Sequence, residues 1–188
     1  MPAPVLNFEV RFHGPVRVGR SRAAPGVDDT VDPEVIVPGS SLKGLMRAEA
    51  IVLLGGEPPL VDAVFGSAQQ PSPWHWDDIR AGDGAADRVR AGARIRVDSA
   101  AGTAVEGGLF TAEYRWPRAA GFAVHRFLAL PEDDQLRHET LLWGSALSVR
   151  SIGADRNRGF GWVEISRAAM PADAALVERV ATLTGVRG

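Results

Sequence analysis

Residues 37–56 read VPGSSLKGLMRAEAIVLLGG, and this stretch decides the fold. Its apolar residues recur three and four positions apart over 42–53, which is the spacing of one face of an α-helix. A serine after the Pro-Gly pair is expected to cap this helix, and the paired glycines at 55–56 are expected to end it. Before it, residues 6–12 alternate between apolar and polar side chains, which predicts a half-buried strand. The chain therefore begins with a strand, a long loop over 13–37 and a helix.

The rest of the chain continues the alternation of strands and helices. Residues 57–92 are rich in Pro, Gly and Ala and are expected to be irregular. After them the patterns predict strands at 94–97, 109–116 and 122–130, a helix at 131–149, a strand at 162–165 and a helix at 172–183. The order strand, helix, strands, helix, strand predicts an α+β fold with a ferredoxin-like βαββαβ core, which RNA-recognition modules also use.

Composition narrows the class of protein. The 188 residues, 45% of them hydrophobic, fit a single globular domain over 1–188 with a helical tail at 167–188. The absence of cysteine excludes disulfides and thiolate zinc sites. The net charge of −2 argues against a free-standing protein that holds nucleic acid by its overall charge, but it allows a local basic groove. No apolar run is long enough to cross a bilayer, so we expect a cytoplasmic protein without a membrane partner.

The start of the predicted helix has the chemistry of an anion site. Amides at a helix N-terminus, two hydroxyls, a lysine and an arginine one turn on suit phosphate. The candidate RNA-binding residues here are Ser40, Ser41, Lys43, Gly44 and Arg47. The alternative is a well-capped helix with a solvated lysine, which the spacing alone favours.

A second candidate is the loop IGADRNRGFG at residues 152–161. Glycines let a backbone approach a ligand closely, arginines meet phosphate, and a phenylalanine can stack on a base. The candidates are Gly153, Arg156, Arg158, Gly159, Phe160 and Gly161. The alternative is a glycine-rich turn between a helix and a strand.

Together the two motifs resemble the RAMP superfamily, the repeat-associated proteins of CRISPR effector complexes. The segments Val64-Phe65-Gly66, Trp76-Asp77-Asp78 and GLFTAE at 108–113 agree, so the resemblance spans roughly residues 5–166. The chain looks closest to the repeated backbone subunit of type III effectors. The resemblance implies binding to CRISPR RNA, to complementary target RNA, to other effector subunits and to copies of itself. It also implies that residues 57–92 form a reduced thumb-like insertion.

The resemblance further implies that an aspartate in the long loop cleaves target RNA. Asp28, preceded by Gly26-Val27, matches best, and Asp29 is second. Because an ordinary aspartate has a pKa of about 3.9 and is a weak base, we expect it to contact a hydrated Mg²⁺ or to orient the 2′-hydroxyl. Arg20 and Arg22, beside this loop, are expected to contact RNA.

Other interpretations remain open. A turn-forming, solvated aspartate pair would make the chain a non-catalytic scaffold or cap subunit that only binds guide RNA. Alternatively His13, at the end of the first strand, could serve a guide-processing ribonuclease that needs no metal. No two histidines have metal-ligand spacing, and His138 is expected to be solvated on a charged helix face.

Overall fold

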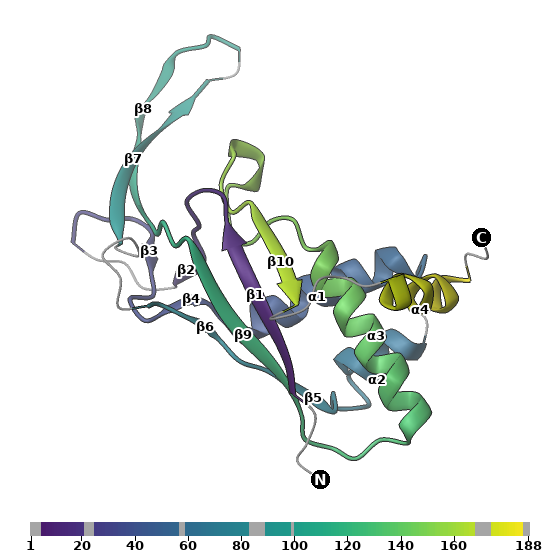
Figure 1. The fold of residues 1–188 in the computed structure, drawn as a ribbon. Helices are drawn as coiled ribbons and strands as arrows, with labels where there is room; N and C mark the ends of the chain where they lie inside the picture. Colours follow the sequence, from purple (N-terminus) through teal and green to yellow (C-terminus); the bar gives the residue numbers. More distant parts are fainter. Residues whose placement is uncertain are drawn as a thin grey trace.

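Four strands form an antiparallel central sheet in the computed structural model, which describes residues 5–20, 25–56, 59–82, 89–98, 100–167 and 174–185. The strands are β1 (Val5–Phe12), β5 (Trp74–Trp76), β9 (Ala119–Arg126) and β10 (Val163–Arg167), and they lie in the order β10-β1-β9-β5 (Figure 1). Every pairing within this sheet is antiparallel.

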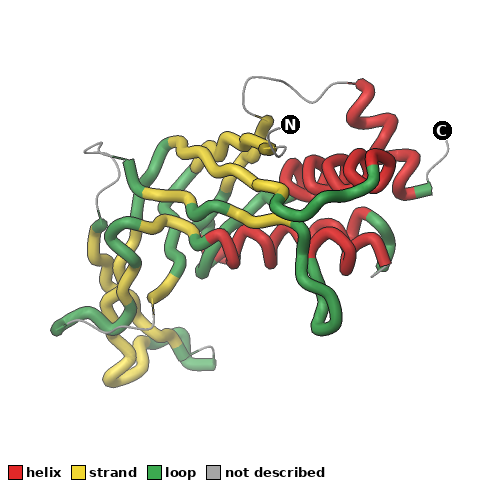
Figure 2. Tube along the Cα trace, turned by 90° about the horizontal axis from the view of Figure 1, so that it is seen from below, coloured by secondary structure: helices red, strands yellow, loops and turns green. Residues whose placement is uncertain are grey.

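The helices lie together on one side of the molecule (Figure 2). They are α1 (Gly39–Leu53), α2 (Pro59–Phe65), α3 (Glu132–Ser148) and α4 (Ala174–Thr184). Alternate residues of β1 are buried, as the sequence predicts, and Phe8 lies at the centre of the core. Its ring stacks on Phe122 at a centroid distance of 4.8 Å and lies 4.3 Å from the ring of Trp143 on α3. Burial of these rings therefore fixes α3 against the sheet.

The order β1, α1, β5, β9, α3, β10 is that of a ferredoxin-like βαββαβ domain. The predicted α+β fold class is confirmed. None of the helices in the described ranges has the length and hydropathy to cross a membrane.

A two-stranded hairpin projects from the sheet (Figure 1). It consists of β7 (Arg90–Val97) and β8 (Ala104–Tyr114), which pair with each other and not with the central sheet. The prediction of strands at 94–97 and 109–116 is confirmed, but these strands form the hairpin and do not belong to the central sheet. One face of the hairpin base packs on the glycine-rich loop, where Tyr114 and Arg94 contact Phe160. The hairpin strands are therefore partly buried at their base, and their pattern resembles that of a strand in a half-buried sheet.

The described residues between 57 and 92 contain part of the core. They include α2, β5 and β6 (Ile79–Arg80), and β5 is the second strand of the core. The predicted reduced thumb-like insertion at 57–92 is thus corrected: the projecting segment begins at Arg90 and ends at Tyr114. β5 escapes pattern recognition because it has three residues and follows a Pro-Ser-Pro segment.

The remaining strands are short and form two separate two-stranded sheets. β2 (Gly19–Arg20) pairs with β3 (Thr30–Val31), and β4 (Val35–Val37) pairs with β6. A 3₁₀ turn, η2 (Arg156–Arg158), lies in the glycine-rich loop. The predicted helical tail contains α4, and residues 168–173 and 186–188 lie outside the described residues.

Candidate functional site

Asp28 lies at the base of the projecting hairpin. Its backbone N–H donates to the Thr111 carbonyl of β8 at 2.9 Å, and the Thr111 N–H donates to its carboxylate at 2.8 Å. The side chain is exposed. Asp28 therefore has a fixed position while its carboxylate faces solvent.

Asp29, the second candidate, is partly exposed and is held by different contacts. Its carboxylate forms an ion pair with Arg17, its side chain is 37% exposed, and its carbonyl accepts a hydrogen bond from the Glu113 N–H at 2.9 Å. Of the two candidates, Asp28 is the more exposed, and Asp29 compensates a largely buried arginine.

Asp155 joins the glycine-rich loop to the hairpin and to the long loop. Arg17 donates to its carboxylate from Nε at 3.2 Å and from a terminal nitrogen at 3.0 Å, and Arg94 of β7 forms an ion pair with it at 2.5 Å. All three side chains are nearly buried, that of Asp155 being 12% exposed. The hydrogen bond from Arg94, followed by the contacts of Arg17, holds the pKa of Asp155 below its usual value, and the same bond raises the pKa of Arg94.

The sequence did not identify Asp155, Arg17 or Arg94 as site residues. Arg17 and Asp155 lie 138 positions apart, and no local pattern links them. One local signal exists in hindsight: Asp155 adopts the left-handed conformation at φ 64°, which Asp and Asn tolerate best after Gly. The cluster of Asp29, Arg17, Asp155 and Arg94 is called the ionic hub below.

The glycines of the 152–161 loop bring the chain close to itself. A Cβ at Gly153 would overlap the Arg17 carbonyl, and one at Gly161 would overlap the Ile152 carbonyl. Both residues have positive φ, whereas Gly159, also at positive φ, has open space around it. These two close approaches are therefore to protein backbone, and they shape the turn.

The same loop presents two exposed arginines. Arg156 and Arg158 form the 3₁₀ turn and line a hollow of about 500 Å³ together with Asn157. Phe160 instead packs on the hairpin: its ring centroid lies 5.0 Å from that of Tyr114 and 5.4 Å from the Arg94 guanidinium. In this loop the two arginines are available to phosphate, and Phe160 has a packing role.

The N-terminus of α1 already holds a carboxylate. The Gly39 N–H donates to Asp78 at 2.8 Å, and the N-cap position is Pro38, without a side-chain cap. The prediction that a serine caps this helix is therefore wrong. The Ser40 side chain is exposed, as is Gly44, and Ser41 is half-buried. Because Asp78 takes one of the free amides, an incoming phosphate has fewer donors here than the sequence implies.

The basic residues of α1 also have partners within the protein. Lys43 lies over the Trp76 ring at 5.4 Å, and burial, helped by Arg47, lowers the pKa of its ammonium group. Arg47 forms an ion pair at 3.0 Å with Asp62 of α2. For the other predicted contacts, Arg22 and the side chain of Arg20 lie outside the described residues.

The fold and sequence can now be compared with known proteins. The model of the RAMP superfamily matches residues 9–164. This chain belongs to the RAMP superfamily. No protein of curated function matches it significantly.

Solved structures share the fold of this RAMP protein. A chain of type III-B Cmr-β bound to cognate target RNA is 12% identical, with a TM-score of 0.66, over 87% of this chain and 97% of that one. A chain of apo type III-B Cmr-β is 11% identical, with a TM-score of 0.68, over 88% and 97%.

The open face of the central sheet is not an aromatic platform in this RAMP protein. Within its four strands the described residues of that face include Glu9, Arg11 and Glu164, and no Phe, Tyr or Trp. At one edge of the face His125 hydrogen-bonds Asp77 at 2.8 Å. At the opposite end of the sheet His13 lies 3.8 Å from Glu164. Stacking of bases on Phe, Tyr or Trp, in the manner of RNA-recognition modules, therefore has no support on this face, where the ring-bearing side chains are His75 and His125.

The residues around Asp28 fit a magnesium ion only in a limited way. Among the described residues no three His, Asp or Glu side chains come together as a metal site. Mg²⁺ in phosphate chemistry commonly binds one or two carboxylates and completes its shell with water and phosphate oxygens. Asp28 alone can supply one such carboxylate.

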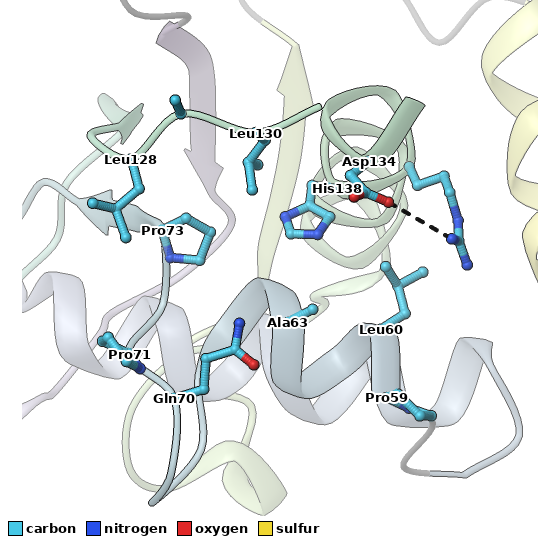
Figure 3. A pocket seen from close by; sticks show the side chains of 12 residues that line it. Pro59, Leu60, Ala63, Gln70, Pro71, Pro73, Leu128, Leu130, Asp134 and His138 are labelled. Atoms are coloured by element: carbon cyan, nitrogen blue, oxygen red, sulfur yellow. Dashed lines mark ion pairs between the residues drawn. The ribbon is translucent and has the colours of Figure 1, made fainter. Parts of the chain in front are cut away.

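A further hollow of about 440 Å³ lies between α2, α3 and the segment after β9 (Figure 3). Leucine and proline side chains dominate its walls, and Asp134 pairs with Arg137 at 3.9 Å beside it. His138 lines it and is 4% exposed, so the prediction of a solvated histidine is wrong. Nδ1 accepts a hydrogen bond from the Trp74 indole at 3.2 Å, and burial lowers the pKa of His138. This hollow lacks the cationic character of an RNA site.

Proposed function

We propose that this RAMP protein is an RNA-binding subunit of a type III CRISPR effector complex and that Asp28 takes part in cleaving guide-paired target RNA. Membership of the superfamily supports the effector role, and the chains of similar fold come from type III-B Cmr-β, one of them bound to cognate target RNA. The observation that carries the cleavage role is the exposed carboxylate of Asp28, fixed by two hydrogen bonds to Thr111.

The guide would bind through local cations, because the net charge is −2. Arg156 and Arg158 are exposed and have no carboxylate partner among the described residues, so they are the first candidates for the phosphates. Lys43 and Arg47 already have contacts within the protein, so we expect them to contribute less to guide binding.

In the proposed cleavage a 2′-hydroxyl attacks the adjacent phosphorus in line with the leaving 5′-oxygen. The new bond from phosphorus to the 2′-oxygen replaces its bond to the 5′-oxygen, the hydroxyl proton passes to water, and the 5′-oxygen takes a proton from water. Asp28 would accept a hydrogen bond from the 2′-hydroxyl and hold it in that orientation. A bound Mg²⁺ would supply electrostatic stabilisation of the phosphate, with Asp28 as its one protein carboxylate. Arg17, by compensating Asp29, keeps the second carboxylate of the loop away from the anionic substrate.

The test is cleavage of target RNA by the reconstituted, guide-loaded complex in Mg²⁺ or in EDTA. We expect Asp28→Asn to slow cleavage by about a hundredfold or more while guide binding persists. Asp133→Asn, an exposed aspartate at the start of α3, is the matched control and should cleave normally. Normal cleavage by Asp28→Asn would refute the role of Asp28.

A scaffold subunit is the second candidate function. One observation favours it: the described residues contain no group of three His, Asp or Glu side chains that could hold a metal, and Asp29, beside Asp28, is paired with Arg17. In that case the wild-type complex binds guide RNA with strong salt dependence but leaves the target intact in Mg²⁺.

A further inference from the structure

A hollow beside Trp116 is not used by the proposed function. It has a volume of about 470 Å³ and lies where the chain leaves the hairpin and enters β9. Phe12, His13, Arg90, Trp116, Pro117 and Arg118 line it. The hollow thus combines the end of β1, the start of the hairpin and the turn before β9. Its volume is in the range of small-ligand sites.

Trp116 offers this hollow an exposed aromatic surface. Trp74, Trp76 and Trp143 are buried in the core, and Trp162, which is 56% exposed, does not line the hollow. Trp116 is 36% exposed. Two neighbours hold the ring: the Arg90 guanidinium lies 5.5 Å from its centroid, and the Tyr114 ring meets it edge-on at 6.0 Å. The indole is therefore positioned by the protein while part of it faces solvent.

The hollow is cationic. Its lining contains Arg90 and Arg118 but no Asp or Glu. Neither arginine takes part in an ion pair recorded among the described residues. Arg17 and Arg94, by contrast, are each compensated by Asp155. The chain thus leaves two guanidinium groups without carboxylates next to an exposed indole.

We propose that this hollow binds an unpaired RNA base, stacked on Trp116, with the neighbouring phosphates held by Arg90 and Arg118. Every base has a π-face, so stacking on an aromatic ring tolerates any sequence, and arginines track the backbone. The base must be unpaired, because a base within a duplex already has its faces covered. This proposal rests on the proposed function for the identity of the ligand as RNA, and it adds a contact that selects single-stranded segments.

The site is within reach of Asp28 on the same RNA strand. Thr111, which fixes Asp28, and Trp116 are five residues apart, so they are separated by at most roughly 18 Å of extended chain. A strand whose scissile phosphate lies at Asp28 could place a base on Trp116 a few nucleotides away. The Trp116 hollow would then help to orient that strand.

The experiment measures fluorescence polarisation of a short, labelled, unstructured single-stranded RNA and of its duplex, with the full chain. We expect Trp116→Ala to weaken single-strand binding between about 5- and 100-fold and to leave duplex binding unchanged. Trp116→Phe should retain most of the affinity, which separates stacking from misfolding. Phe127→Ala removes another exposed aromatic, at the far end of β9, and serves as the control.

A salt titration separates stacking from charge. Arg90→Gln and Arg118→Gln should each flatten the slope of log K against log salt by about 0.7, whereas Trp116→Ala should lower affinity without changing the slope. If Trp116→Ala binds RNA with wild-type affinity while the double variant Arg156→Gln/Arg158→Gln loses affinity, base binding in the hollow is refuted and the proposed function stands. No RNA binding by any form would overturn both. A change in oligomeric mass in Trp116→Ala at unchanged RNA affinity would make the hollow a contact between chains and overturn the proposal.

Discussion

Asp155 compensates two arginines that are far from it and from each other in the sequence, Arg17 and Arg94, and its charge should therefore have a large effect on stability. Removing one partner of a largely buried ion pair leaves the other charge uncompensated, which costs roughly 3 kcal/mol. We expect Asp155→Asn to lower the free energy of unfolding by about that amount at pH 7, measured by urea denaturation. Asp133→Asn, which is exposed at the N-terminus of α3, should cost less than about 1 kcal/mol.

The effect of Asp155 should depend on pH in a known direction. Its pKa is lower in the folded chain than the usual value of 3.8, so near that pH the unfolded chain binds the proton more readily. The stabilisation is complete above about pH 3.8 and is lost as the pH falls through the folded pKa. Wild type and Asp155→Asn should consequently converge in stability at low pH. A constant difference between them across this range would show that packing, and not charge, carries the effect.

At the scale of an element, α1 contains two glycines with opposite requirements. A Cβ at Gly39 would overlap the Trp76 carbonyl of β5, whereas a Cβ at Gly44 would meet nothing within 4 Å. Gly39→Ala should therefore destabilise the protein by about 2–3 kcal/mol, because α1 must move away from β5. Gly44→Ala should stabilise it by about 0.5–1 kcal/mol through helix propensity. Urea unfolding of both variants checks this, and destabilisation of equal size in the two would contradict the packing argument.

Elements with a long, regular pattern were predictable from the sequence, and short or remote contacts were not. β1 and α1 have clear periods of 2 and 3.6 residues, and both occur within one or two residues of their predicted bounds. β5 has three residues, so its burial depends on the sheet that forms around it. In the candidate site, the family resemblance pointed to Asp28. The ionic hub could not be predicted in this way, because it depends on contacts between residues as far apart as Arg17 and Asp155.

At the scale of the whole molecule, the structure gives different surroundings to the arginines of the hub and to those of the candidate RNA sites. Arg17, Arg47 and Arg94 are matched with carboxylates and hold segments of the fold together. Arg90 and Arg118 beside Trp116, and Arg156 and Arg158 in the glycine-rich loop, have no such partner among the described residues. A net charge of −2 therefore does not prevent RNA binding through these two local groups, while Arg17, Arg47 and Arg94 stabilise the fold.

This division predicts a moderate salt dependence of RNA binding. Each phosphate contact to a single strand contributes about −0.7 to the slope of log K against log salt, so the four arginines of these two sites contribute roughly −3. Polarisation titrations of the full chain with single-stranded RNA over a range of KCl concentrations measure this slope. Removing all four guanidinium charges should flatten the slope by about that amount, because the arginines of the ionic hub remain bound to Asp155 and Asp29. An unchanged slope in this variant would contradict the assignment of phosphate contacts to these four residues.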